Sequence, residues 1–381
     1  MKPYESPWMD DDLRMLREAV SRFVETEMLP HEAQWRKQKH VDRATWRRTG
    51  EAGFLLMDVP GEYGGGGGDF RHEAVLYEEC NRRGLSGFGQ GVHSIAAHYV
   101  LNYGTEEQKQ RWLPRMASGE LIGAIAMTEP GAGSDLKGIR TRAVREGDEY
   151  VINGSKIFIT NGSIATILML VVRTDPNDRS RGLSILMVET ENLPGYRVGR
   201  VLDKMGMTAQ DTSELYFEDV RVPADCLLGL EEGRGMHMLM GDLPYERLTI
   251  ALGGVAAMEG AYAETVRYTK ERQAFGQKIA DFQNTRFKLA EVATHVHVAR
   301  VFVDRCIEQL VKGELDTETA AMAKWWITDI QQKVMDECVQ LFGGYGYMNE
   351  YLVCRMFADS RVQRIYGGTN EIMKELISRS I

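Results

Sequence analysis

Two segments near the middle of the chain could together form a platform for a flat cofactor. They are residues 127–135 (MTEPGAGSD) and residues 153–162 (NGSKIFITNG). Gly131 and Gly133 have no Cβ, so the main chain there can approach a planar ligand closely. Taken alone, each segment is also explained as an ordinary turn, because Gly and Asp are common turn residues for backbone reasons. The side chains that favour the platform are the hydroxyls of Thr128, Ser134 and Thr160 and the aromatic face of Phe158.

Further segments follow these two in a fixed order. They are residues 244–253 (PYERLTIALG), 271–277 (ERQAFGQ), 340–350 (QLFGGYGYMNE) and 364–373 (RIYGGTNEIM). Together with the platform segments they resemble the acyl-CoA dehydrogenase family, whose signature is long and specific. The resemblance covers most of the chain and implies an FAD-dependent dehydrogenase that desaturates an acyl-CoA between its α and β carbons.

That reaction requires a carboxylate that takes the α proton, an oxidised flavin that receives the β hydride, and donors on the thioester oxygen, where negative charge builds up. Many members of the family place the base in a YEGT motif near the C-terminus. The matching residues here are 366–369 (YGGT), so Gly367 occupies the position of the usual glutamate. Its main-chain N–H remains, by resemblance, a donor to the thioester oxygen, together with a ribityl hydroxyl of the flavin.

Glu246 matches the alternative base of the long-chain and isovaleryl branches of the family. A glycine at 367 agrees with this position, because two carboxylates in one dry pocket would repel each other. Without the resemblance, Glu246 is better explained as a first-turn glutamate that complements the helix dipole after Pro244. Burial would raise its pKa and the helix N-terminus would lower it, and the sequence leaves that balance open.

The resemblance also implies the residues that bind substrate and cofactor. Arg247 has a substrate-side role, for which a solvated arginine is the alternative explanation. Phe158 replaces the more usual Trp. The substrate positions are Ser134, Pro244, Tyr245, Arg247, Gly367 and Gly368. The FAD positions are Ile125, Met127, Thr128, Ser134, Phe158, Ile159, Thr160, Arg272, Phe275, Gln283, Gln340, Gly343, Gly344, Thr369, Asn370 and Glu371.

By the same resemblance, six of these residues reach the FAD of a neighbouring subunit: Arg272, Phe275, Gln283, Gln340, Gly343 and Gly344. This implies at least a dimer and, as the family norm, a homotetramer. An electron-transfer flavoprotein is the implied acceptor. The long-chain branch is the best match, while branched and terpenoid acyl-CoAs stay open as substrates. Two alternatives are an acyl-CoA oxidase, which is typically a much longer chain, and a nucleic-acid-associated flavoprotein of the same fold.

Composition and charge exclude some kinds of partner, binding site and location. The net charge of −9 disfavours a nucleic-acid partner. No apolar run approaches the ~20 residues that span a bilayer. Five scattered cysteines are typical of reduced thiols, and the histidines form no HExxH, so no metal site is predicted. The N-terminal residues MKPYESPWMDDD resemble neither a signal nor a transit peptide, which favours the cytoplasm, or the mitochondrial matrix for a processed chain.

The elements that must position these residues are predicted as helices, then strands, then helices. Helical spacing from Leu13 to Val24 ends at a predicted stop, Pro30, and residues 60–70 form a flexible glycine-rich loop. Thr105 to Gln108 form a capping box for a short helix that ends near Leu113.

Strands are predicted for the middle of the chain, with a hairpin turn at Asn153-Gly154 and short strands over residues 164–172, 183–189 and 214–220. No GxGxxG motif follows a strand, which argues against a doubly wound fold.

Long helices are predicted over residues 284–313 and 317–342, the second ending at the C-cap Gly343-Gly344. The predicted fold class is therefore α+β, mostly α. It has an N-terminal helical domain (1–120), a middle β-barrel domain (121–228) and a C-terminal four-helix bundle (229–381), the architecture that the resemblance also implies.

Overall fold

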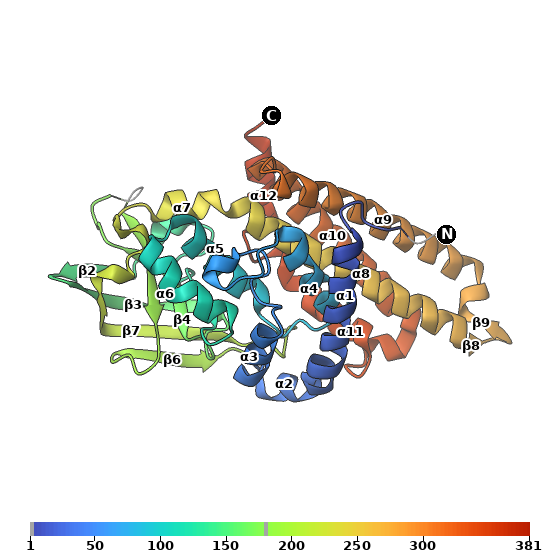
Figure 1. Cartoon of the computed structure of the whole chain (residues 1–381). Helices are drawn as coiled ribbons and strands as arrows, with labels where there is room; N and C mark the ends of the chain where they lie inside the picture. Colours follow the sequence, from blue (N-terminus) through green and yellow to red (C-terminus); the bar gives the residue numbers. More distant parts are fainter. Residues whose placement is uncertain (1–3, 179–181) are drawn as a thin grey trace.

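The computed structural model describes residues 4–178 and 182–381; residues 1–3, where the N-terminal segment considered above begins, and residues 179–181 lie outside them. Helices, a sheet and again helices follow one another along the chain (Figure 1), so the predicted fold class is confirmed. The helices of the first part are α1 (Asp11–Phe23), α2 (Glu32–Gln38), α3 (Arg43–Glu51), α4 (Phe70–Arg82), α5 (Gln90–Tyr103) and α6 (Glu106–Ala117).

The predicted helix stop at Pro30 lies two residues after the observed one, because α1 and the π-helical turn that extends it end at Met28 and α2 is a separate helix. After α1 the chain continues through a π-helical turn (Val24–Met28) and a 3-10 turn (Leu29–His31) into α2. Pro30 lies at the start of the 3-10 turn, where a missing N–H breaks no helical hydrogen bond. The buried side chains of Val24 and Met28 keep the segment packed on the core.

The predicted capping box at Thr105 is confirmed. The N–H of Gln108 donates to the Thr105 hydroxyl (3.3 Å), and the N–H of Thr105 donates to the Gln108 side chain (3.1 Å). The helix α6 extends beyond Leu113 to Ala117, because its buried face continues through Met116. The predicted glycine-rich loop is also a loop, and the N–H groups of residues 65–68 donate to carbonyls of residues 56–60, which attaches it to the segment after α3.

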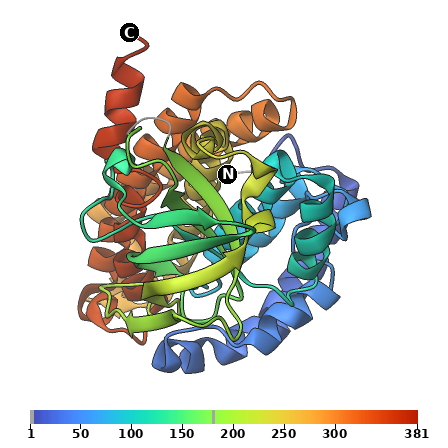
Figure 2. The ribbon, with the colours of Figure 1, turned by 90° about the vertical axis from the view of Figure 1, so that its left-hand side faces the viewer.

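The middle of the chain forms one mixed sheet of seven strands. The strand β4 pairs with β5 on one side and with β1 and β2 on the other; β2 continues to β3, β7 and β6. No pairing among the described residues joins β5 to β6, so the sheet curves into a half-barrel rather than a closed barrel (Figure 2). The strands are β1 (Gly123–Ala126), β2 (Arg142–Glu146), β3 (Glu149–Thr160), β4 (Ile167–Arg173), β5 (Leu183–Glu189), β6 (Tyr196–Val201) and β7 (Thr212–Pro223).

The predicted turn at Asn153-Gly154 is wrong, since β3 runs without interruption through both residues. Gly154, with φ +151°, marks a register shift of β3 against β7. A Cβ on Gly154 would lie 2.5 Å from the Thr141 hydroxyl, so this position requires glycine. The hairpin connects β2 to β3 instead and turns at Gly147, with φ +66°.

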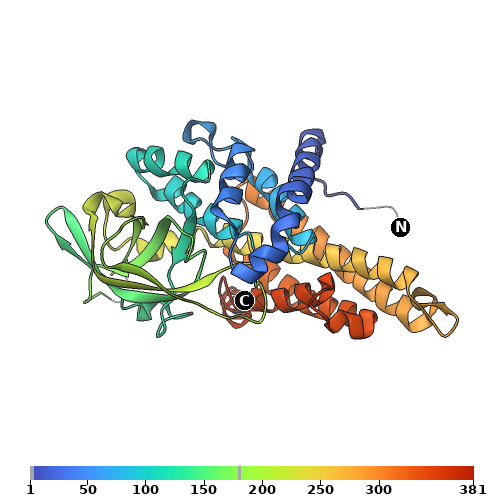
Figure 3. The same ribbon diagram turned by 90° about the horizontal axis from the view of Figure 1, so that it is seen from below.

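The last part contains two long antiparallel helices, α8 (Leu243–Glu271) and α9 (Gln283–Val311), joined at their tip by the short hairpin of β8 (Gln273–Ala274) and β9 (Gln277–Lys278). Figure 3 shows this tip at the opposite end of the molecule from the sheet. The predicted helices over 284–313 and 317–342 are confirmed, and Gly343 forms the C-cap of α10 with φ +59°. The remaining helices are α7 (Gly235–Gly241), α10 (Thr317–Phe342), α11 (Leu352–Ser360) and α12 (Asn370–Ser378).

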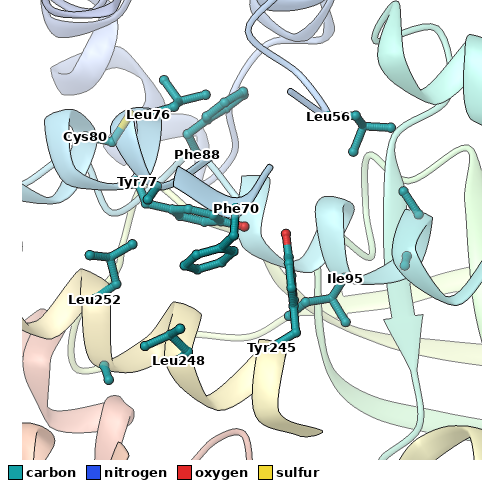
Figure 4. Packing of buried hydrophobic residues seen from close by; sticks show 14 of the residues in the cluster. Leu56, Phe70, Leu76, Tyr77, Cys80, Phe88, Ile95, Tyr245, Leu248 and Leu252 are labelled. Atoms are coloured by element: carbon teal, nitrogen blue, oxygen red, sulfur yellow. The ribbon is translucent and has the colours of Figure 1, made fainter. Parts of the chain in front are cut away.

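The start of α8 is buried against the N-terminal helices. Figure 4 shows Leu248 and Leu252 of α8 packed against Phe70 and Tyr77 of α4. Burial of such side chains is worth about 1.5–3 kcal/mol each, which fixes α8 in this position. Within the described residues, no helix is both long and apolar enough to cross a membrane.

Candidate active site

Glu246 lies in the first turn of α8, two residues after Pro244, as the sequence predicts. Its carboxylate accepts a hydrogen bond from the hydroxyl of Tyr99 in α5, with 2.8 Å between the oxygens. Tyr99 is fully buried. The sequence did not single out Tyr99, because a tyrosine on the buried face of a helix carries no signal for a partner so far along the chain.

Burial raises the pKa of Glu246 to about 7. The hydrogen bond from Tyr99 opposes this rise, the neighbouring carboxylate of Asp242 adds to it, and the charge of Arg247 lowers the pKa. Desolvation therefore prevails in the balance that the sequence left open. A carboxylate with this pKa can accept and release a proton near neutral pH, which suits a general base.

Arg247 is buried, with 3% of its surface exposed, so it is not a solvated arginine. One end of its guanidinium makes a long contact to the carbonyl of Thr317 (3.5 Å), and its Nε has no hydrogen-bond partner. An unpaired buried donor is costly in free energy, which is consistent with a group that a ligand completes.

Gly367 and Gly368 form a left-handed turn with φ values of +61° and +86°. A Cβ on Gly367 would lie 2.3 Å from the Cδ1 of Ile250. Ile250 lies one helical turn after Glu246 and shares its face of α8. The glycine turn (Gly367 and Gly368) and the face of α8 that carries Glu246 therefore lie against each other.

A buried lysine of α10 forms a hydrogen bond to the glycine turn. Lys324 of α10, fully buried, donates to the carbonyl of Gly368 (2.7 Å) and to the side-chain oxygen of Asn370 (3.0 Å). Burial, with a smaller contribution from Arg247, lowers the pKa of Lys324 to about 7. Its position on a helix gave no sequence signal, because its main acceptor is a main-chain carbonyl.

The two platform segments do meet in space. The N–H of Ile157 donates to the carbonyl of Thr128 (2.9 Å), and the buried amine of Lys156 donates to the carbonyl of Met127 (2.9 Å). Positions for a Cβ on Gly131 and Gly133 have no atom within 4 Å.

The platform leaves an aromatic surface open. Phe158 is 63% exposed and is held at φ +61°. An exposed aromatic ring beside accessible main chain fits a flat ring system such as a flavin. Ile125, Met127, Thr128 and Thr160 are partly buried and Ser134 is exposed. The side chain of Ile159, in contrast, points into the sheet core, so only its main chain can face a ligand.

Helix α5 connects the platform to Glu246. Its His93 accepts a hydrogen bond from the N–H of Gly123 at the start of β1 (3.0 Å), while its Tyr99 binds Glu246. Tyr245 turns away from this site: its hydroxyl donates to Asp58 (3.1 Å), and its ring is labelled in Figure 4 among the buried core residues. The side chain of Tyr245 therefore lies in the core, unlike the substrate position expected for it.

The remaining predicted FAD residues fall into two groups. Thr369 caps α12, Glu371 is exposed in its first turn, and Asn370 is buried with its amide bonded to Thr328 and Asp329, so Asn370 braces the chain rather than presenting its amide to a ligand. The second group, at the far end of the molecule, is exposed: Arg272, Phe275, Gln283, Gln340, Gly343 and Gly344.

This second group, the bundle tip, is internally connected, because the guanidinium of Arg272 lies 5.6 Å from the ring centroid of Tyr345, which follows Gly344. Phe275 is 95% exposed. Figure 1 shows the tip, marked by β8 and β9, at the end opposite the sheet, so a single chain does not bring it to the platform.

Comparisons with known proteins identify relatives of the whole chain. Three family models match it: the N-terminal domain of acyl-CoA dehydrogenase over residues 10–120, the middle domain over 124–220 and the C-terminal domain over 233–381. The mitochondrial long-chain specific acyl-CoA dehydrogenase of Mus musculus is 48% identical over 370 residues, covering 96% of this chain and 86% of that protein.

Solved structures agree with this result. The acyl-CoA dehydrogenase of Geobacillus kaustophilus superimposes with a TM-score of 0.96 at 46% identity and covers 99% of both chains. A glutaryl-CoA dehydrogenase of Mycobacterium smegmatis in complex with FADH2 superimposes with a TM-score of 0.90 at 29% identity, covering 98% of this chain and 95% of that one.

Proposed function

The chain belongs to the acyl-CoA dehydrogenase family and is an FAD-dependent acyl-CoA dehydrogenase, and we propose that Glu246 is the base that removes the α proton of its substrate. One observation carries this assignment: the partly buried carboxylate of Glu246, whose pKa desolvation raises to about 7, lies on the face of α8 that meets the glycine turn. The base and the proposed donor to the thioester therefore come from adjacent elements.

The chemistry balances with these groups. As the C–H bond at the α carbon breaks, its electron pair enters the forming double bond to the β carbon, and Glu246 takes the proton. Bound FAD supplies the acceptor for the β hydrogen and its electron pair. The N–H of Gly367 stabilises the charge that develops on the thioester oxygen. The product is a trans-2-enoyl-CoA.

The platform and the bundle tip are the proposed cofactor residues. Thr128, Ser134 and the exposed ring of Phe158 would line the flavin, with main chain at Gly131 and Gly133 close by. Arg272 and Phe275 would hold the diphosphate end of FAD in a neighbouring chain, since paired N–H groups of arginine suit phosphate oxygens. The distance of the tip from the platform supports a homo-oligomer, which we propose is a tetramer. We further propose that each chain has three domains, with boundaries at residues 120/121 and 228/229.

A long-chain acyl-CoA, straight or branched, is the proposed substrate. The 48% identity to a long-chain specific relative supports it, as does the pairing of Glu246 with Gly367. An electron-transfer flavoprotein is the proposed acceptor and fatty-acid β-oxidation the proposed pathway. The relative is named as mitochondrial. For this chain we propose the cytoplasm, or the matrix if the chain comes from a mitochondrion.

Anaerobic titration of the FAD-loaded protein with acyl-CoAs of increasing length, and with branched ones, tests this proposal. We expect flavin absorbance to bleach with one equivalent of substrate, most rapidly for long chains. Since each buried methylene is worth about 0.8 kcal/mol, rates for C4 and C16 substrates should differ many-fold. Failure of every thioester to bleach the flavin would refute the reaction, and equal rates at all lengths would refute only the chain-length preference.

A further inference from the structure

Both flanks of the glycine turn are attached to one helix, α10. Before the turn, Arg364 forms an ion pair with Asp329 of α10 (2.6 Å between Nε and Oδ1). After the turn, Lys324 of α10 donates to the Gly368 carbonyl (2.7 Å). Asn370 ties the two attachments together, because its side chain contacts both Lys324 (3.0 Å) and Asp329 (3.0 Å).

The glycine turn needs such an attachment. Two consecutive glycines have more conformational freedom than any other pair of residues and no side chains that could pack. Among the described residues, no hydrogen bond uses the N–H of Gly367. The direction of this donor is therefore set by contacts of the neighbouring groups.

We propose that Lys324 is a positioning residue for the reaction, whose amine fixes the Gly368 carbonyl and thereby the direction of the Gly367 N–H. The inference rests on the proposed role of that N–H at the thioester oxygen. Lys324 touches neither substrate nor cofactor in this assignment. It acts through the glycine turn, as the only side chain in the described structure that donates to the Gly368 carbonyl.

A purely structural lysine would have different consequences from a positioning lysine. Loss of a structural contact would lower thermal stability and FAD content without altering how the thioester oxygen is stabilised. Loss of a positioning contact would leave substrate binding largely intact, because the acyl chain and CoA still bind, but would weaken stabilisation of charge on that oxygen. The two roles are therefore separable by a measurement on a bound, charged ligand.

The test compares Lys324→Met, Lys324→Gln and Lys333→Met as FAD-loaded proteins. Methionine removes the amine at nearly constant volume, glutamine retains a shorter donor, and Lys333 is an exposed lysine of the same helix. Acetoacetyl-CoA is the ligand, because its enol ionises at the position where the thioester oxygen is charged. The pH dependence of the long-wavelength absorbance of the complex with flavin gives the pKa of the bound enol.

For Lys324→Met we expect this pKa to rise by about one unit, and kcat for flavin reduction to fall at least about tenfold with little change in KM, since oxyanion donors are worth such factors. The enol pKa and kcat of Lys324→Gln should lie between those of Lys324→Met and the parent protein. Both quantities in Lys333→Met should equal those of the parent protein. An unchanged enol pKa and kcat in Lys324→Met, with or without a lower Tm, would overturn the proposal.

If Lys324→Met does not assemble with FAD, the enol pKa and kcat of Lys324→Gln test the proposal instead. Values equal to those of the parent protein would then overturn it. Failure of the proposed function looks different: the unaltered protein itself would then show no flavin reduction by any acyl-CoA. Its enol pKa could still be compared with that of the lysine variants.

Discussion

At the scale of single residues, the environment of Glu246 determines its chemistry. The glutamate stands at a helix N-terminus, a position that usually favours the charged form, yet burial raises its pKa to about 7. The hydrogen bond from Tyr99 (2.8 Å) opposes this rise, and the charge of Arg247 lowers the pKa further. Burial and the hydrogen bond from Tyr99 of α5 thus give Glu246 of α8 a pKa suited to proton transfer at neutral pH.

Substitution of Tyr99 by Phe should shift the pH dependence of the reaction. The base must be ionised, so kcat/KM rises as pH passes upward through the pKa of Glu246 in the free protein. Without the hydrogen bond that lowers it, this pKa should increase, and the acidic limb should move to higher pH by about one unit.

The measurement is the rate of anaerobic flavin reduction between pH 5 and 9 at low substrate concentration. Tyr150→Phe is the matched control, because it removes another tyrosine–glutamate hydrogen bond, from β3 to Glu232 in the segment before α7 (2.6 Å). An acidic limb that stays in place or moves to lower pH in Tyr99→Phe would contradict the role assigned to this bond.

At the scale of elements, the contact between α8 and the glycine turn explains why a glutamate on one accompanies a glycine on the other. A side chain at 367 would enter the space beside Ile250, one turn from Glu246. A carboxylate introduced at 367 should therefore approach the same α carbon from the opposite side.

We expect Gly367→Glu to restore part of the activity of Glu246→Gln, by about tenfold or more, when Ile250→Val is added to make room. Recovery stays partial because a non-glycine residue at φ +61° is strained. The control is Gly367→Gln in the same background, which has the same size and no carboxylate. Equal rates with Glu and Gln at 367 would show that the two positions do not share one substrate carbon.

The elements also show how far the sequence was informative. Long helices such as α10 follow from their apolar periodicity, and the Thr105 capping box follows from local contacts. The prediction at Asn153-Gly154 failed because the same dipeptide suits a hairpin turn and a strand irregularity, and the pairing of β3 with the distant strand β7 decides between them.

The polar contacts of the site could not be predicted from the sequence for a different reason. Tyr99 and Glu246 are 147 residues apart, and Lys324 and Gly368 are 44 apart. No local pattern encodes such pairs, and a carbonyl acceptor leaves no trace in the residue type. The candidate base, in contrast, was predicted because Glu246 and Gly367 match the family that the chain resembles; the local sequence alone favours a first-turn glutamate that complements the helix dipole.

At the scale of the whole molecule, the separation between the platform and the bundle tip supports a cofactor site shared between chains. The tip carries an exposed arginine and a phenylalanine that is 95% exposed, which a monomer would leave in water. A second chain that places its tip over the platform would cover both.

Mixed oligomers test this arrangement. Arg272→Glu should lose most of its FAD, and Glu246→Gln should be inactive, each as a homo-oligomer. When the two are dissociated and reassembled together, sites that combine Glu246 of one chain with Arg272 of another should be active. Random pairing makes these about a quarter of all sites. A mixture with no more activity than the separate proteins would show that each chain completes its own site.

The most direct measurement of the central claim is the rate of flavin reduction in Glu246→Gln, mixed anaerobically with the best long-chain acyl-CoA. Glutamine keeps the size of the side chain and can still accept from Tyr99, but it cannot take a proton. We expect FAD content and acyl-CoA affinity close to those of the parent protein and a reduction rate lower by about 10²–10⁴-fold, the range for loss of a general base. Flavin reduction in Glu246→Gln within a few-fold of the parent rate would contradict the assignment of Glu246 as the base.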